Sequence, residues 1–283
     1  ETDRPWWQAL RDPPLQIGER IRRAVPNLEG LYWVDFSVLD VFPPPAEIAA
    51  AHAARVPVLA ELFTSEGCSS CPPADDLLRR LLKEQPVDGV EVIALGEHVD
   101  YWNRLGWRDP YSAEQFTQRQ SDYARMMGTA QIYTPQLVIN GTIEVIGNDA
   151  QAVKDALVRG AHLPRAQLAV SWQPVDHGIS VKVVASDVPV STGSGPIEVV
   201  VAVVEDGLVS EVSRGENARR RLRHDAVVRR LAPIGTILPG RYAGVFERVM
   251  AAPDRSSASA LRLVAFLQDS KTRRVLGVAA SPL

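Results

Sequence analysis

The sequence predicts an α/β protein in which elements in the order β-α-β-α-β-β-α are followed by a β-sandwich-like region. Three observations predict this class. Short apolar runs alternate with segments of helical periodicity between residues 57 and 163. Asn140-Gly141 separates two apolar runs, which indicates a hairpin because both residues tolerate a positive φ. After Pro164, strand-like runs follow one another with few helical segments.

The elements of the α/β region can be placed individually. Pro72 and Pro73 suit the first turn of a helix, whose N–H groups have no intrahelical partner. Asp149 is placed to cap the last helix of this region. In chain order we expect strand Val58–Phe63, helix Pro72–Glu84, strand Val90–Leu95, helix Tyr111–Met127, strands Gln136–Ile139 and Thr142–Ile146, and helix Ala150–Arg159. This is the order of the thioredoxin fold.

The length of 283 residues favours two domains. Residues 1–56 are punctuated by prolines and are interpreted as an N-terminal extension, with a partner-binding or anchoring role as the alternative. Residues 57–163 form the predicted thioredoxin-like domain, and residues 164–283 the β-rich domain. Its expected strands are Leu168–Trp172, Ile179–Ala185, Ile197–Glu205, Arg241–Val249, Leu261–Gln268 and Val275–Ala279.

The two cysteines of the chain, Cys68 and Cys71, stand in one Cys-x-x-Cys motif after the first predicted strand and before the first predicted helix. This layout is typical of thiol–disulfide sites. The N–H groups at a helix N-terminus stabilise a thiolate and lower its pKa into the range of about 3.5–7.5. We therefore expect Cys68 to attack a substrate disulfide and Cys71, the buried thiol, to resolve the mixed disulfide.

Other residues are expected near this pair. In the thioredoxin fold the position of Thr134-Pro135 carries a cis-proline that faces the cysteines, and it exposes the Thr134 backbone to a substrate peptide. The ionisable residues expected nearby are Glu61, Glu66, His98 and Asp100. Glu61 is a candidate proton relay and His98 a candidate acid or base; ordinary structural roles are the alternative for both. An aromatic loop with Tyr101, Trp102, Trp107 and Tyr111 either packs on the second helix or forms a wall of the site.

Composition excludes several functions. The net charge of −3 gives no general attraction for nucleic acid or an anionic membrane, and no apolar run is long enough for a membrane span. A cluster of arginines between Arg219 and Arg230 is interpreted as a solvated edge, with recognition of an acidic partner as the alternative. Zinc usually needs four ligands, and only one cysteine pair is present, so no metal site and no cofactor are expected.

Several motifs together resemble a bacterial family of secreted thioredoxin-like proteins of unknown function. They are the segment Glu61–Asp75 with Gly-Cys-Ser-Ser-Cys-Pro-Pro-Ala-Asp, His-Val-Asp-Tyr-Trp at 98–102, Tyr-Thr-Pro-Gln at 133–136, Glu216-Asn217, and the segment His224–Arg229. The resemblance covers residues 57–280 and implies a thioredoxin fold, a β-rich C-terminal domain and export. Gly67 and Pro72 differ from the tryptophan and lysine of thioredoxin itself, so interaction with thioredoxin reductase is not expected.

The sequence thus predicts a thiol–disulfide oxidoreductase that acts on protein thiols or disulfides, with no partner among nucleic acids. Two alternatives stay open: a non-catalytic thioredoxin-like binding protein with a structural disulfide, and a metal-binding protein that uses the cysteine pair. The chain begins with Glu1, consistent with a removed leader, and the expected location is periplasmic or secreted, with the cytoplasm as the alternative. The substrate, the direction of the reaction and the oligomeric state are left open.

Overall fold

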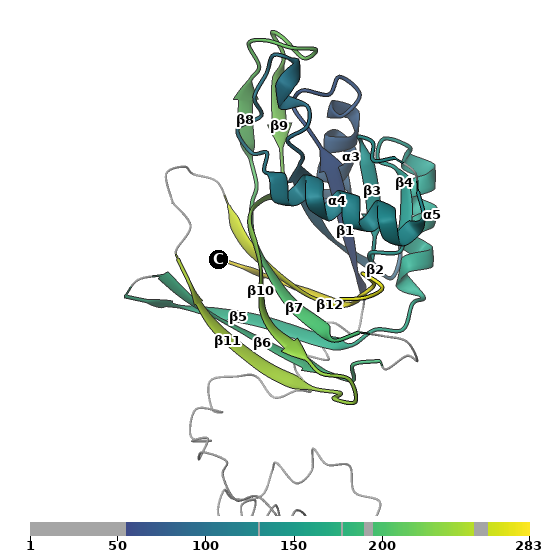
Figure 1. Ribbon diagram of the computed structural model, residues 1–283, viewed down its shortest axis with the longest axis vertical. Helices are drawn as coiled ribbons and strands as arrows, with labels where there is room; N and C mark the ends of the chain where they lie inside the picture. Colours follow the sequence, from purple (N-terminus) through teal and green to yellow (C-terminus); the bar gives the residue numbers. More distant parts are fainter. Residues whose placement is uncertain (1–54, 130, 177, 190–194, 252–259) are drawn as a thin grey trace, which may run out of the picture. The chain divides into compact units, whose positions relative to one another are not determined.

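The computed structural model describes residues 55–283, except 130, 177, 190–194 and 252–259. The predicted N-terminal extension therefore lies outside the described residues, apart from Arg55 and Val56. The protein has a mixed α/β architecture with a large mixed sheet and few helices (Figure 1). None of the helices in the described part of the chain is both long and apolar enough to cross a membrane.

The first half of the described chain contains its elements in the predicted order. They are β1 (Val56–Thr64), α3 (Pro72–Glu84), β2 (Val90–His98), a 3-10 turn (Asn103–Leu105), α4 (Glu114–Met127), β3 (Gln136–Ile139), β4 (Ile143–Ile146) and α5 (Ala150–Ala161). Strand β1 pairs in parallel with β2 and antiparallel with β3, which forms a hairpin with β4. Helix α4 covers one face of this part of the sheet, and α3 and α5 cover the other (Figure 1).

Local sequence explains the turn between β3 and β4. Asn140 and Gly141 have φ values of 45° and 70°, in the left-handed region that an Asn-Gly turn requires. A Cβ on Gly141 would also collide with the carbonyl oxygen of Arg273. The Asn140 side chain accepts from the Leu59 N–H at 2.9 Å and donates to the Gly160 carbonyl at 3.0 Å. The hairpin is thus tied both to β1 and to α5.

The second half consists of strands, several of which the sequence did not predict. They are β5 (Gln167–Val175), β6 (Gly178–Ser186), β7 (Ile197–Glu205), β8 (Leu208–Glu211), β9 (Arg221–His224), β10 (Val227–Ile237), β11 (Gly244–Met250), β12 (Leu261–Asp269) and β13 (Val275–Pro282). Strands β8, β9 and β10 were not expected, because charged residues, Pro233 and Gly235 interrupt the alternation of apolar and polar residues. The pairing of β10 with β7 is itself irregular at Pro233.

The large sheet is continuous across the predicted domain boundary at residues 163 and 164. Its strand order is β13-β12-β7-β10-β2-β1-β3-β4. Strand β10 runs parallel to β2 where Val227 meets Gly96, and the Gly96 N–H donates to the Ala226 carbonyl at 2.6 Å. The regions on the two sides of this boundary therefore share one sheet.

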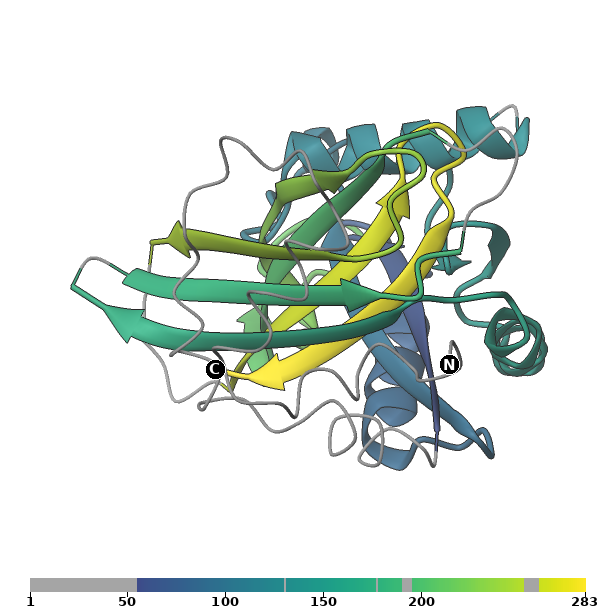
Figure 2. The same ribbon diagram turned by 90° about the horizontal axis from the view of Figure 1, so that it is seen from below.

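Alternation along β7 explains how the large sheet serves two cores. Val200, Ala202 and Val204 belong to the core that includes α3, α4 and α5 residues. The intervening residues, Val199, Val201 and Val203, face the opposite way and pack on the three-stranded sheet β11-β6-β5. Successive side chains of a strand point to opposite faces, so an almost continuous valine run indicates burial on both. Figure 2 shows the three-stranded sheet crossing this part of the large sheet.

A buried arginine connects the two halves of the large sheet. Arg119 on α4 donates to the Glu61 carboxylate on β1 at 2.7 Å and to the Gln268 side-chain oxygen on β12 at 2.9 Å. The Tyr123 hydroxyl donates to the other Glu61 oxygen at 2.5 Å. Glu97 on β2 lies 3.4 Å from the guanidinium, and burial raises the pKa of Glu97 well above its ordinary value.

Replacement of Arg119 by methionine is expected to lower the free energy of unfolding by about 3–5 kcal/mol, because it leaves the Glu61 charge buried without a cationic partner. Denaturant unfolding measures the effect. The matched control is Arg79→Met, which removes the partly exposed pair with Asp76 and is expected to cost less than about 1 kcal/mol. Equal losses in the two variants would contradict this assignment.

Candidate functional site at the cysteine pair

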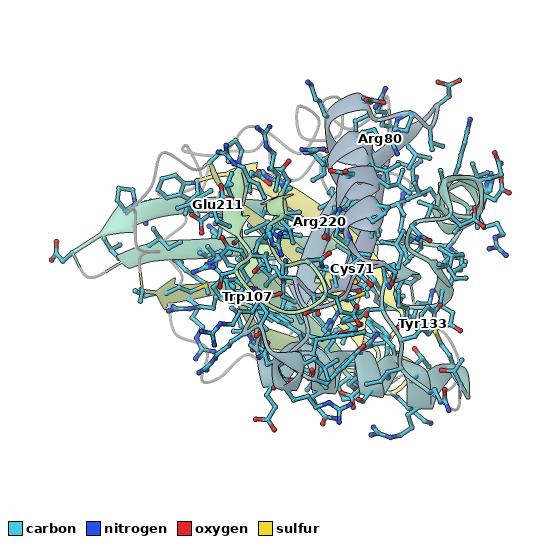
Figure 3. All side chains as sticks on the ribbon, turned by 90° about the horizontal axis from the view of Figure 1, so that it is seen from above. Cys71, Arg80, Trp107, Tyr133, Glu211 and Arg220 are labelled. Carbon is cyan, nitrogen blue, oxygen red and sulfur yellow. The ribbon has the colours of Figure 1, made fainter. Side chains whose placement is uncertain are left out.

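The two cysteines lie in the turn that leads from β1 into α3. The Cys68 N–H donates to the Ser65 carbonyl at 3.1 Å, and the Cys71 N–H donates to the Cys68 carbonyl at 3.2 Å. Cys71 is the N-cap of α3, and its carbonyl accepts from the N–H groups of Ala74 and Asp75. Figure 3 shows Cys71 at the start of this helix. Both cysteine side chains are buried in this turn.

The pKa values of the two thiols are shifted in opposite directions, although both cysteines are free and buried. A hydrogen bond from the Cys71 thiol is the largest of the causes that lower the pKa of Cys68 to about 6, and Ser70 adds to it. The Ser70 hydroxyl lies 3.2 Å from the Cys68 sulfur. Burial, above all, raises the pKa of Cys71 far above its ordinary value. Near neutral pH, Cys68 therefore carries the negative charge and Cys71 keeps its proton.

Thr134 and Pro135 lie beside the pair, as the sequence predicted, and the peptide bond between them is cis. The Thr134 carbonyl oxygen lies 3.9 Å from the Cys68 sulfur. The Thr134 hydroxyl accepts from the indole N–H of Trp102 at 2.9 Å, so the aromatic loop holds this segment in place. A Cβ on Gly67 would stand 3.0 Å from the Trp102 Cβ, which explains why a residue without a side chain precedes Cys68.

Asp75 is a buried carboxylate in the first turn of α3, and it was not among the predicted site residues. It is buried, and burial raises its pKa to about 7 although His224 opposes the shift. Its charge is also one of the causes that raise the pKa of Cys71. A spacing of four residues on a helix brings the side chains of Cys71 and Asp75 to one face, which is the signal that could have identified it.

Glu61 occupies a different place from the one expected. Its carboxylate is bound by Arg119 and Tyr123, and no hydrogen bond or ion pair joins it to either cysteine among the described residues. Asp100 accepts from the Thr117 hydroxyl on α4 at 2.6 Å and likewise makes no such contact with the cysteines within the described ranges. These two predicted residues belong to the framework around α4.

Glu66 and His98 belong to a buried network behind the cysteine turn. Glu66 accepts from the Trp107 indole N–H at 2.7 Å and lies 3.1 Å from the His224 ring nitrogen. His224 in turn lies 3.7 Å from Asp75. His98 lies 2.7 Å from Asp109, and its ring contacts the His224 ring with centroids 4.9 Å apart. The network therefore extends from the aromatic loop to the start of α3.

Asp109 also organises the loop that precedes the second predicted helix. Burial acts to raise the pKa of Asp109, but the charge and hydrogen bond of His98 hold it below its ordinary value. The same carboxylate accepts from the N–H of Glu66 at 2.8 Å and of Tyr111 at 2.9 Å. The chain is extended at Ala113, so α4 begins at Glu114 and not at Tyr111 as expected.

The β-rich half completes the site. The Asn217 side-chain amide donates to the Glu66 carbonyl at 2.8 Å and to the Cys68 carbonyl at 2.9 Å. The exposed Glu216 carboxylate accepts from the Ser69 N–H at 3.0 Å. Hydrogen bonds from the Ser69 side chain and then from this N–H lower the pKa of Glu216. Among the described residues, no group of three or more His, Cys, Asp and Glu side chains is arranged to hold a metal ion.

Removal of the Cys71 thiol is expected to raise the pKa of Cys68 from about 6 toward its ordinary value, because it removes the strongest hydrogen bond to the thiolate. The smaller change, Ser70→Ala, is expected to raise this pKa less. Ultraviolet absorbance of the thiolate against pH measures both variants, Cys71→Ala and Ser70→Ala. A larger effect of Ser70→Ala would show that the order of these causes is wrong.

Comparison with known proteins finds a family and several similar solved structures. The model of a family described as "Protein of unknown function (DUF1223)" matches residues 59–268. A crystal structure of an Agrobacterium tumefaciens protein is similar with a TM-score of 0.57 and 27% identity, covering 80% of this chain and 93% of that chain. HBP35 of Porphyromonas gingivalis is similar in fold, with a TM-score of 0.55 and 12% identity, and the similarity covers 81% of this chain and 76% of that chain. None of the curated proteins matches this sequence.

Proposed function

The chain belongs to the DUF1223 family, and we propose that it is a thiol–disulfide oxidoreductase that acts on protein thiols or disulfides through Cys68 and Cys71. The observation that carries this proposal is the opposite shift of the two thiol pKa values within one turn. We further propose that residues 57–163 adopt a thioredoxin-like fold around the pair and that the following strands are β-sandwich-like. Thiol–disulfide exchange needs a thiolate as nucleophile, and of the two cysteines only Cys68 is a thiolate near neutral pH.

The proposed reaction begins with attack of the Cys68 thiolate on one sulfur of a substrate disulfide. The substrate S–S bond breaks, a mixed disulfide forms, and the other substrate sulfur leaves as a thiolate that takes up a proton. Cys71 then loses its proton and attacks the Cys68 sulfur, which releases the second substrate thiol. The substrate disulfide gains two electrons, and the cysteine pair is oxidised to a disulfide.

The second step needs a proton acceptor, since burial holds Cys71 in its neutral form. We assign this role to Asp75, because it lies on the same face of α3 as Cys71 and its pKa is about 7. A carboxylate with a pKa near the working pH is suited to accept and return a proton. Glu61 is not available for the role, because Arg119 and Tyr123 already bind its carboxylate.

The reverse reaction, in which an oxidised pair takes electrons from substrate thiols, uses the same groups. A reduction potential of the pair near about −120 mV would indicate an oxidant, and one near about −270 mV a reductant. The proposed location is outside the cytoplasm, where proteins form and exchange disulfides.

Replacement of Cys71 by serine is expected to trap substrate proteins as mixed disulfides on Cys68, because the resolving thiol is absent. The variant is expressed in the native host and analysed by non-reducing electrophoresis and mass spectrometry. Cys68→Ser is the matched control and should trap none, since it has lost the nucleophile. Absence of trapped protein with Cys71→Ser, or equal trapping by the control, would refute the proposed function.

Replacement of Asp75 by asparagine is expected to slow resolution of the mixed disulfide by at least about tenfold, since general acid–base catalysis contributes 10²–10⁴-fold. Rapid quenching of the reduced protein with glutathione disulfide follows the mixed disulfide by mass. In the unmodified protein the resolution rate should rise as the pH passes through about 7, and the variant should lose this rise. An unchanged pH profile would contradict the assignment.

Asp75→Asn is also expected to change how the stability of the protein depends on pH. The folded pKa of Asp75 is raised, so the folded protein holds a proton that the unfolded chain has lost between pH values of about 4 and 7. Stability contributed by this proton is lost as the pH rises through that window. Asp75→Asn should therefore show a smaller loss of stability with rising pH, which thermal unfolding at a series of pH values measures.

A non-catalytic binding protein is the second candidate, and the burial of the Cys68 side chain favours it. A catalytic Cys68 requires that the turn opens to admit a substrate sulfur. Alkylation of the reduced protein distinguishes the two, because reaction at Cys68 and not at Cys71 supports catalysis. If the Cys68→Ser, Cys71→Ser double variant keeps the full phenotype, the binding function is supported instead.

A further inference from the structure

A cationic groove lies between α3 and β9, next to the cysteine pair. It has a volume of about 320 Å³, and α3 contributes Arg79 while the segment at β9 contributes Arg220, Arg221 and Arg223. A second hollow of about 370 Å³ shares Arg79 and Arg223 with the first, so the two continue along the same helix. In Figure 3, seen from above, Cys71 is at the start of α3, Arg220 lies beside the helix near Cys71, and Arg80 is farther along the helix.

The charge of the groove is strongly positive after its internal pairs are counted. Three carboxylates and six cationic side chains line the two hollows. The cationic side chains are Arg79, Arg80, Lys83, Arg220, Arg221 and Arg223. Arg79 binds Asp76 at 2.6 Å, and Arg221 lies 3.4 Å from Glu211. Arg80, Lys83 and Arg223 form no ion pair with any residue that the structure describes. The chain as a whole has a net charge of −3, so this excess is local.

The groove is connected to the cysteine turn by covalent and hydrogen-bonded contacts. Pro72, which directly follows Cys71, is part of its wall, and so is Asp75. Arg220 donates to the side-chain oxygen of Asn217 at 2.8 Å, and Asn217 donates to the Cys68 carbonyl. A chain bound in the groove would therefore extend toward the position at which a sulfur meets Cys68.

We infer that this groove binds an acidic segment of the protein whose thiols or disulfide react at Cys68. The inference rests on the proposed function and names its substrate class. Charge complementarity selects an acidic partner and speeds its association. A protein segment fits better than a nucleic acid, because no aromatic side chain lines either hollow and single strands are usually bound on aromatic platforms.

The test uses the full chain with Cys68→Ser and Cys71→Ser, so that binding is measured without thiol chemistry. The probe is a fluorescent oligoglutamate peptide, followed by anisotropy at low and high salt. We expect the peptide to bind and to dissociate as the salt concentration rises. An oligolysine peptide of equal length should not bind.

Charge-reversed variants distinguish binding in the groove from a general effect of the protein's net charge. Arg80→Glu with Arg223→Glu should weaken peptide binding by at least about tenfold, because both cations are unpaired and become repulsive. The control variant, Lys154→Glu with Arg230→Glu, makes the same change of net charge at two exposed positions outside the groove. It should change the affinity for the peptide little.

Several results would overturn the inference. They are absence of peptide binding, equal losses in the two charge-reversed variants, and equally tight binding of a single-stranded oligonucleotide. Because the probe contains no sulfur and the protein no thiol, these results leave the trapping experiment on Cys68 unaffected. Conversely, failure to trap a substrate with Cys71→Ser, together with normal peptide binding, would refute the redox function and leave an acidic-segment binding site.

Discussion

The burial of Arg119 is the constraint on which the rest of the structure depends. Its guanidinium is held between Glu61 of β1 and Gln268 of β12, and it therefore links strands that lie far apart in the chain. A buried charge requires such partners, because an unpaired one costs several kcal/mol. Glu61, the candidate proton relay of the sequence analysis, is thereby committed to the framework, and for this reason we propose Asp75 as the proton acceptor of the pair.

The cysteine turn itself is assembled from three separate parts of the chain. Strand β1 and helix α3 supply the turn, the segment at Thr134 supplies a carbonyl beside Cys68, and Asn217 ties the Cys68 backbone to the β-rich half. Residues of the second half thus contact the cysteine turn directly. Asn217 and the arginines at the start of β9 that line the cationic groove lie within seven residues of one another in the chain.

Much of the first half could be predicted because its signals are local. The apolar run of β1, the two prolines at the start of α3 and the Asn140-Gly141 turn each act through neighbouring residues. The strands β8, β9 and β10 could not be predicted in this way. Their charged residues and the irregularity at Pro233 conceal the alternation, and β10 is stabilised by pairing with β7 and β2 instead of by its own pattern.

The sequence by itself determined the order of elements from β1 to α5 and the position of the two cysteines before a helix, because hydrophobic periodicity and turn chemistry act over a few residues. Only the tertiary structure decided which carboxylate near the pair is buried with a raised pKa. Asp75, four residues after Cys71, has its pKa raised by burial, and burial depends on what packs around it. His224 and Asn217 reach the site through sheet pairing over long distances in the chain, which no local pattern records.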